Sequence, residues 1–161
     1  MREPTSPTAI KFQEELQTLG LNGRVVEFET TTRTAADAAA AIGCELGQIV
    51  KSLIFKTTNS GHAVLVYTSG SNRVDEKRIE GLVGEPLSKA DADFVRSVTG
   101  FAIGGVPPFG FSHPQHTYLD EDLLQYAEVW AAAGTPNSVF PLRVEELIRL
   151  TGAKQTRVSG G

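Results

Sequence analysis

The sequence has 161 residues, which is the usual size of one domain, so a second folded unit is not expected. Hydrophobic residues make up 40% and charged residues 21%, and no apolar run approaches the roughly 18 residues of a membrane helix, which excludes membrane-spanning and disordered classes. A net charge of −4, from 15 basic and 19 acidic residues, argues against extensive duplex binding. A few local basic side chains would still suffice to hold the end of a nucleic acid.

The N-terminus and the cysteine content indicate the compartment. Residues 1–8 contain a basic residue but no apolar stretch behind it, so they do not resemble a secretory signal. The single cysteine, Cys44, cannot form an internal disulfide, which agrees with a reducing environment. We expect a cytoplasmic protein without a membrane partner.

The first half of the sequence predicts two helices and three strands. Hydrophobic spacing predicts an amphipathic helix over 7–20 and a short strand over 24–29. Thr34 begins an alanine-rich helix in the manner of a capping box, and Gly43 ends it. Strands over 49–55 and 62–68 follow, and the loop over 57–61 has the length and composition of a hairpin. These two strands are therefore predicted to be antiparallel neighbours.

The second half predicts two helices, a loop rich in glycine and proline, three short strands and a closing helix. In chain order these are helices 75–83 and 91–99, the loop 101–110, strands 117–119 and 129–132, an edge strand 139–142 and a helix 143–150 that Gly152 ends. Strict strand and helix alternation is absent, so the pattern predicts one α+β domain with a mixed, largely antiparallel sheet or barrel flanked by helices, its core at about 7–152.

Lys51 is the most informative single residue. The period of two over 49–55 places it among Ile49, Leu53 and Phe55 on an apolar face, so its ammonium group requires a partner. The pattern fits equally a lysine near the strand end that extends to solvent. A functional lysine here would suit binding a phosphate or polarising a carbonyl oxygen.

The segment from Gly104 to Gly110 is the second candidate. Its glycines allow close approach of the backbone to a ligand, and its two prolines stiffen the loop. Such a loop could form an oxyanion hole or a carboxyl-binding nest, although a simple turn is the ordinary interpretation. It lacks the sequence of a phosphate-binding P-loop.

Other chemistries have little support in the sequence. Cys44 follows the glycine that ends a helix, where the dipole disfavours a thiolate, and a small buried side chain is the better interpretation. His113 and His116 have no third metal ligand at a recognisable spacing, and no serine-hydrolase elbow is present. Asp120 and the two acids after it would ordinarily form a solvated cap, and Arg73 would ordinarily be surface charge. A functional Arg73 would contact a phosphate or ribose near the lysine strand.

Taken in order, five segments resemble the YbaK / prolyl-tRNA synthetase-associated editing domain over nearly the whole chain. They are 34–36 before the alanine-rich helix, 49–53 with Lys51, 72–75, the Gly/Pro segment 99–110, and 118–120. The resemblance implies a mixed α/β, barrel-like fold and hydrolysis of the ester between a wrong amino acid and the terminal adenosine of a tRNA. Synthetase regions are absent from the sequence, which implies action in trans.

The resemblance also implies a site. Lys51 corresponds to the essential lysine of the family, and the loop from Gly104 to Pro108, with Gly105, to its Gly-x-x-x-Pro loop, without a protein nucleophile, metal or other cofactor. The implied substrate-binding residues are Phe28, Thr34, Ser52, Arg73, Val106, Pro107, Pro108, Asp120, Ala132 and Gly134. The implied partner is the aminoacyl-tRNA 3′ end at the acceptor stem, with an aminoacyl-tRNA synthetase as a further candidate.

In segment 131–138 the sequence differs from the small Gly-rich turn of many family members, and these residues would set the size of the amino-acid pocket. The resemblance therefore leaves the amino acid undecided among small residues such as alanine or cysteine on proline tRNA. Two alternatives also stay open. The first is a catalytically silent module that binds aminoacyl-adenosine or tRNA 3′ ends, and the second is a thiol or metal hydrolase that uses Cys44 or the two histidines.

Overall fold

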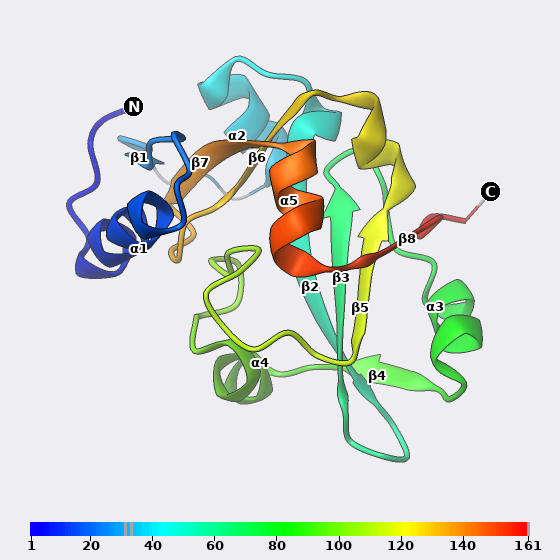
Figure 1. Cartoon of the computed structure of the whole chain (residues 1–161). Coiled ribbons are helices and arrows are strands. Elements are labelled where there is room, and N and C mark those ends of the chain that lie inside the picture. Colours follow the sequence, from blue (N-terminus) through cyan, green and yellow to red (C-terminus); the bar gives the residue numbers. More distant parts are fainter. Residues whose placement is uncertain (31, 33, 161) are drawn as a thin grey trace.

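A mixed sheet of eight strands forms the centre of the computed structural model, which describes residues 1–30, 32 and 34–160 (Figure 1). The strands are β1 (Val26–Glu27), β2 (Ile49–Thr57), β3 (Ala63–Ser69), β4 (Leu87–Lys89), β5 (His116–Asp120), β6 (Glu128–Ala132), β7 (Ser138–Arg143) and β8 (Lys154–Thr156). The helices are α1 (Pro7–Thr18), α2 (Ala35–Ile42), α3 (Glu76–Val83), α4 (Ala92–Thr99) and α5 (Val144–Thr151), with 3₁₀ turns η1 (Leu46–Gln48) and η2 (Glu121–Gln125).

The strand order is β1-β7-β6-β2-β3-β5-β8, and β4 pairs with β2 outside this path. Four pairings are antiparallel, β1 with β7, β7 with β6, and β2 with both β3 and β4. Three are parallel, β2 with β6, β3 with β5, and β5 with β8. The predicted α+β class and mixed sheet are confirmed. The terminal strands β1 and β8 lie at opposite sides of the molecule, so the sheet is open and not a closed barrel (Figure 1).

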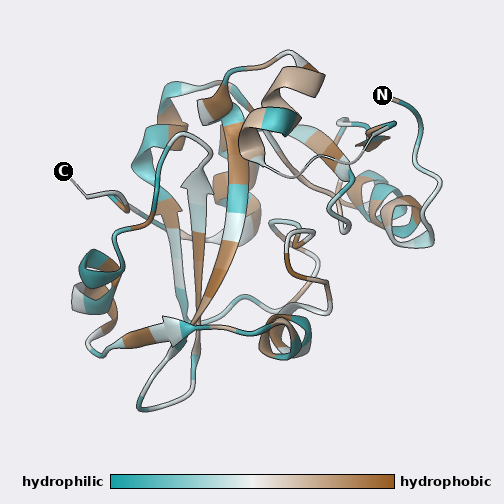
Figure 2. Ribbon diagram, turned by 180° about the vertical axis from the view of Figure 1, so that it is seen from behind, coloured by the Kyte–Doolittle hydropathy of each residue, from teal (hydrophilic) through white to brown (hydrophobic). Residues whose placement is uncertain are grey.

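Helices cover both faces of the sheet. Val50 and Ile54 of β2 pack toward α1, α5 and the Gly/Pro loop, whereas Ile49 packs toward α2 and Phe55 toward α3. This alternation follows from the period of two along a strand. Figure 2 shows apolar residues along the central strands, whereas the surrounding helices carry both hydrophilic and apolar residues.

The signals that begin and end helices act as predicted. The Thr34 side chain accepts a hydrogen bond from the Asp37 N–H at 3.1 Å and caps α2, and Gly43 ends that helix with φ 86°. Gly152 ends α5 in the same left-handed conformation, with φ 60°. The hairpin of β2 and β3 is also confirmed, with Lys51 opposite Thr68.

The predicted edge strand 139–142 is corrected by the structure. β7 lies between β6 and β1, and the two residues of β1 pair with Val139 and Ser138. Pro141 lies beyond that short pairing and faces Trp130 of β6, so its missing N–H removes no ladder bond on the β1 side. Strands β4 and β8 were not predicted. Among the described residues, no helix is long and apolar enough to cross a membrane.

Candidate functional site

A pocket of about 540 Å³ opens beside the middle of β2. Every residue of β2 from Ile49 to Phe55 lines it. Side chains alternate between the two faces of a strand, so seven consecutive residues can line one pocket only where the strand presents its edge. The other lining residues are Phe28, Thr32, Thr34, Ala35, Ala38, Lys89, Ala90, Val95, Ile103, Gly104, Val106, Trp130, Ala131, Ala132, Pro136, Ser138 and Val139.

The pocket exists because the sheet is interrupted at this edge. β2 pairs with β6 only at Ile49 and Val50, and with β4 only from Phe55 to Thr57. Between these pairings no described strand covers the edge. Lys51 and Ser52, which belong to opposite faces of the sheet, therefore border the same pocket.

Lys51 is held at one end of the pocket. Its Nζ donates to the carbonyl oxygen of Asn72 at 3.0 Å. The Asn72 side chain in turn donates to Asp120 Oδ2 at 2.9 Å and to Asp122 Oδ2 at 2.7 Å. Burial lowers the pKa of Lys51, and the nearby charge of Arg73 lowers it further, against the opposing effect of Asp120. A partly desolvated ammonium group interacts more strongly with an anion or a carbonyl oxygen than a fully hydrated one.

Asp120 supports this arrangement from behind. Its Oδ1 accepts from the Asp122 N–H at 3.0 Å, which caps η2, and its Oδ2 accepts from the Ser69 N–H at 3.0 Å. Asp120 caps η2 as predicted, but it is only 1% exposed and therefore not solvated. The two acids that follow it are exposed, as predicted. Asp120 fixes the turn that carries Asn72 and is not among the residues that line the pocket.

The Gly/Pro loop contributes a second wall. Gly104 has φ 85°, a conformation that favours glycine, and the Gly105 N–H donates to the Ala102 carbonyl oxygen at 3.0 Å. The Gly105 N–H is thus used within the loop itself. Among the described residues, the N–H groups of Gly104 and Val106 have no hydrogen-bond partner, and both residues line the pocket. These two N–H groups, like that of Ile103 beside them, are free to bind a ligand in the pocket.

The end of the loop is anchored to β3. The buried Tyr67 hydroxyl donates to the carbonyl oxygen of Pro108, and His113 Nε2 lies 3.0 Å from both of these oxygen atoms. Burial raises the pKa of Tyr67, which keeps its hydroxyl protonated as a donor. No local sequence pattern indicates this contact, because the residues involved are far apart in the chain.

Ser52 carries an unused polar group at the pocket wall. Its Oγ is buried and has no hydrogen-bond partner in the described part of the chain. The same is true of Thr68 Oγ1, which belongs to the residue opposite Lys51. Buried hydroxyl groups in native proteins are nearly always hydrogen bonded. Ser52 lines the pocket, but its Oγ itself is buried beneath the wall and has almost no surface exposed to it.

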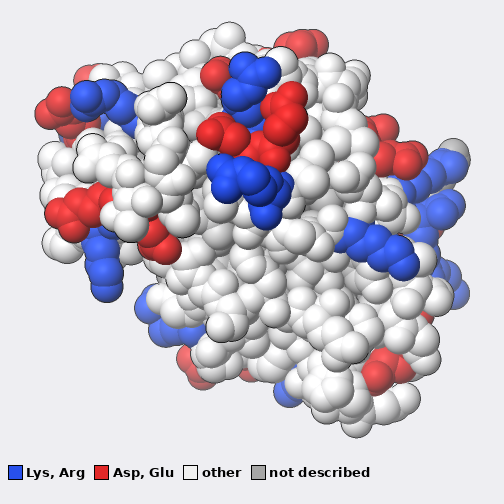
Figure 3. Space-filling view, in the orientation of Figure 1, with Lys and Arg blue, Asp and Glu red and all other residues white. Residues whose placement is uncertain are grey.

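The structure brings together seven of the residues that the resemblance implied and places six outside the pocket lining. Those that line it are Phe28, Thr34, Lys51, Ser52, Gly104, Val106 and Ala132. Those that do not are Arg73, Gly105, Pro107, Pro108, Asp120 and Gly134. Arg73 is exposed in a separate shallow hollow beside the Asn72 turn. Figure 3 shows basic and acidic side chains mixed over the upper part of this face and several Lys and Arg side chains gathered at its right edge, on the side of α3 and the C-terminus.

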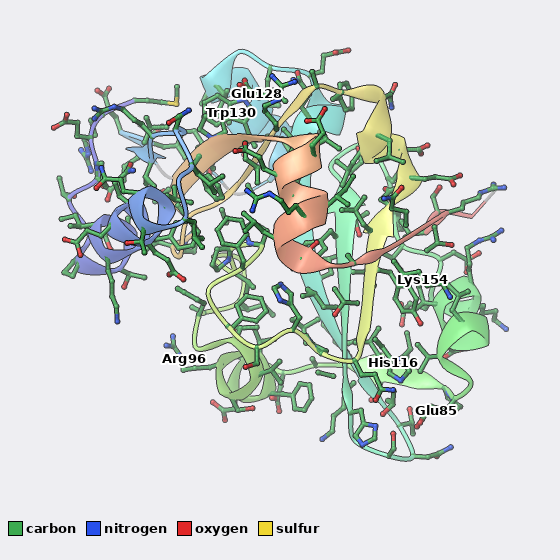
Figure 4. The ribbon with its side chains drawn as sticks, in the orientation of Figure 1. Glu85, Arg96, His116, Glu128, Trp130 and Lys154 are labelled. Atoms are coloured by element: carbon green, nitrogen blue, oxygen red, sulfur yellow. The ribbon has the colours of Figure 1, made fainter. Side chains whose placement is uncertain are left out.

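Trp130 is a pocket residue that the sequence analysis missed. It lies on β6 beside the α2 end of the molecule, where it packs against the cluster of Phe28, Ala38 and Ile49 (Figure 4). The signal that could have found it is its place opposite Ile49 in a parallel pairing, which no local pattern gives. With these neighbours it makes the α2 side of the pocket apolar.

Cys44 does not have the surroundings of a nucleophile. It is half-buried, burial raises the pKa of its thiol, and it is not among the residues that line the pocket. Among the described residues, no group of three or more His, Cys, Asp or Glu could hold a metal ion.

Comparisons with known proteins agree with the geometry. The profile of the aminoacyl-tRNA editing domain family matches residues 29–150. The uncharacterized protein YwhH of Bacillus subtilis strain 168 is 35% identical over 130 residues, 81% of this chain and 82% of its own. EbsC of Enterococcus faecalis, a candidate Cys-tRNA(Pro)/Cys-tRNA(Cys) deacylase, is 26% identical over 127 residues, 78% of this chain and 77% of its own.

A solved structure extends the likeness over the whole fold. The crystal structure of a candidate trans-editing enzyme for prolyl-tRNA synthetase is 50% identical, with a TM-score of 0.89, and the match covers 98% of this chain and all of that one. The chain belongs to the aminoacyl-tRNA editing domain family.

Proposed function

We propose that the protein is a trans-editing aminoacyl-tRNA deacylase that removes a small mischarged amino acid, such as alanine or cysteine on proline tRNA. The observation that carries the proposal is that Lys51 and the unpartnered N–H groups of the Gly/Pro loop line one pocket in a chain of the editing family. The descriptions of two relatives as deacylase and trans-editing enzyme support the same reaction class.

In the proposed reaction, water adds to the ester carbonyl carbon and gives a tetrahedral oxyanion. The N–H groups of Gly104 and Val106 stabilise that charge, because donors held in a rigid loop need no reorganisation as the charge develops. Collapse of the intermediate breaks the bond to the ribose oxygen, which takes up a proton and leaves. The ribose hydroxyl of the substrate helps to activate the water, so no protein nucleophile is required.

Lys51 and Ser52 hold the substrate in this scheme. The Lys51 ammonium group binds the terminal nucleotide or the ester carbonyl oxygen, while Ser52 contacts the substrate as part of the pocket wall. Arg73, exposed beside the Asn72 turn, contacts a phosphate of the acceptor stem. A small acyl group fits a pocket whose α2 side is apolar, and a difference of one methylene is worth only about 1–3 kcal/mol of discrimination.

The test is the release of amino acid from proline tRNA charged in turn with alanine, cysteine, serine, threonine or proline. We expect hydrolysis of one or two of these esters, and loss of at least 100-fold in kcat/KM in Lys51→Ala, as for removal of one strong transition-state contact. Lys56→Ala is the matched control, since Lys56 is an exposed lysine on the same strand outside the pocket lining. Full activity of Lys51→Ala would refute the assigned role, and binding of charged tRNA without turnover would favour the silent module.

A further inference from the structure

The uncovered edge of β2 is itself a hydrogen-bonding surface. Pairing with β6 ends at Val50 and pairing with β4 begins at Phe55, which leaves the four residues 51–54 without a strand on that side. All four line the pocket. A ligand in the pocket therefore meets main-chain groups as well as side chains.

The pairing with β3 determines which main-chain groups face the pocket. The Ile49 carbonyl oxygen accepts from the Gly70 N–H at 2.7 Å, and the Thr57 N–H donates to the His62 carbonyl oxygen at 2.8 Å. Odd-numbered residues of β2 thus direct their polar groups toward β3. Because these directions alternate along an antiparallel strand, the even-numbered residues direct theirs to the opposite edge.

Two of the main-chain groups on the uncovered edge of β2 lie next to each other, one an acceptor and one a donor. The C=O of Ser52 is an acceptor and the N–H of Ile54 is a donor, and neither has a described strand partner. Ser52 and Ile54 are half-buried residues of the pocket wall, so this donor and this acceptor are free to bind a ligand that enters the pocket. A ligand that satisfies both must offer a donor and an acceptor side by side, as a neighbouring strand would.

Adenine has this arrangement. Its exocyclic N6 amino group is a donor and the adjacent ring N1 is an acceptor, and both lie in the plane of a flat ring. The gap has apolar walls on both sides, Ala35 and Ala38 from α2 and Val95 and Val106 from the opposite side. The ribose, phosphate and ester of an aminoacyl nucleotide offer no such neutral, flat pair of donor and acceptor.

We infer that the edge of β2 binds the adenine of the terminal nucleotide, with N6 donating to the Ser52 carbonyl oxygen and N1 accepting from the Ile54 N–H. This inference rests on the proposed function, because it assigns a part of the same substrate. It places the base beside Ser52 and Ile54 and leaves Lys51, one residue earlier, for the ester or the phosphate.

The substrates for the test are short RNAs that end in CCA, carry an alanyl or cysteinyl ester, and differ only in the last base. Inosine reverses both contacts, because it has an oxygen at position 6 and a proton on N1. 7-Deazaadenosine keeps N6 and N1 and serves as the matched control. We expect kcat/KM for the inosine substrate to fall about 10-fold or more, in the range that one bidentate base contact provides, and the 7-deaza substrate to react like adenosine.

A second readout observes the strand directly. In ¹⁵N-labelled protein, adenosine should shift the Ile54 amide signal and slow its hydrogen exchange, whereas inosine should not. The Lys56 amide is the internal control, because Lys56 belongs to the part of β2 that pairs with β4.

The outcomes separate this inference from the proposed function. Equal hydrolysis of the adenosine and inosine esters would overturn the base contact and leave the deacylase intact, and an equal loss with 7-deazaadenosine would overturn the assignment to N1. If no ester is hydrolysed, the deacylase proposal fails. Protection of the Ile54 amide by adenosine alone would then still support the base site, and no protection would overturn it.

Discussion

The Tyr67 hydroxyl donates a hydrogen bond to the carbonyl oxygen of Pro108, and this contact joins the central strand β3 to the end of the Gly/Pro loop. Tyr67 is fully buried, and His113 Nε2 lies 3.0 Å from the same carbonyl oxygen. The position of the loop N–H groups therefore depends on a residue that does not line the pocket.

Replacing Tyr67 by Phe removes this bond without removing the ring. We expect kcat to fall about 10-fold with little change in KM, because small displacements of stabilising groups reduce the rate more than binding. The free energy of unfolding should fall by about 1–2 kcal/mol. Deacylation kinetics and urea unfolding test this.

Tyr118→Phe is the control for Tyr67→Phe, because Tyr118 is also buried on a central strand but packs on the opposite face, toward α3. It should leave kcat unchanged. An unchanged kcat in Tyr67→Phe, with the stability loss present, would show that the bond serves folding alone.

Gly105 has no room for a side chain. A Cβ there would lie 2.8 Å from the backbone of Thr135, which cannot move as a flexible side chain can. We expect Gly105→Ala to displace the loop, to destabilise the protein by about 1–3 kcal/mol and to lower kcat. Thermal unfolding and initial rates measure the two effects.

Gly81→Ala is the opposite case. Gly81 lies within α3, and a Cβ there would meet nothing within 4 Å. This variant should stabilise the protein by about 0.5–1 kcal/mol and leave the activity unchanged. If Gly105→Ala were as stable and as active as Gly81→Ala, the close packing of Gly105 against the backbone of Thr135 would not be needed for activity.

The alkaline limb of the pH–rate profile should report Lys51. Burial and the charge of Arg73 lower the pKa of Lys51, so the ammonium form is lost at a lower pH than in an ordinary lysine. If the charged form is the active one, kcat/KM falls as pH rises through that lowered pKa. The rate must be corrected for spontaneous ester hydrolysis, which increases with pH.

Lys51→Arg checks this assignment. An arginine stays protonated across the accessible range, so any remaining activity of this variant should show no alkaline loss. If the unmodified protein and Lys51→Arg lose activity at the same alkaline pH, the group that titrates there is not Lys51.

Glu27 of β1 holds the N-terminal segment in place. Its carboxylate accepts from the N–H groups of Thr5 at 2.7 Å and Ser6 at 2.8 Å, and Arg2 lies 3.7 Å away. Burial alone would raise the pKa of Glu27, but these hydrogen bonds and the nearby charge outweigh it and lower the pKa. The ionised carboxylate therefore stabilises the folded state.

We expect Glu27→Gln to reduce the free energy of unfolding by about 1–3 kcal/mol at neutral pH. Because the folded pKa is the lower one, the contribution is complete above the ordinary glutamate pKa and disappears as pH falls through the lowered value. The difference between the two proteins should thus shrink in acid. Glu29→Gln, at an exposed position, should change stability by less than about 0.5 kcal/mol at any pH.

Local signals were enough to predict much of the fold. The Thr34 cap, the glycines that end helices, and the alternation in β2 and β3 act over a few residues and need no tertiary context. The strands β4 and β8 have three residues each, and their pairing partners rather than their own sequence make them strands.

The candidate site was predictable in part. Lys51 and the Gly/Pro loop have unusual residue types and were recognised from the sequence. The gap beside β2 was not, because residues 51–54 continue the same pattern as the paired residues on either side, and only the lengths of β6 and β4 create the gap. The Tyr67 contact to Pro108 spans 41 residues, which no local pattern records.

An unpaired strand edge is ordinarily a hazard for self-association, because it can recruit a strand from another molecule. Here β6 and β4 flank an opening of only four residues, too short for a second chain to extend its own ladder without colliding with them. The opening therefore excludes a strand from another molecule and admits only a compact ligand to the main-chain groups of residues 51–54.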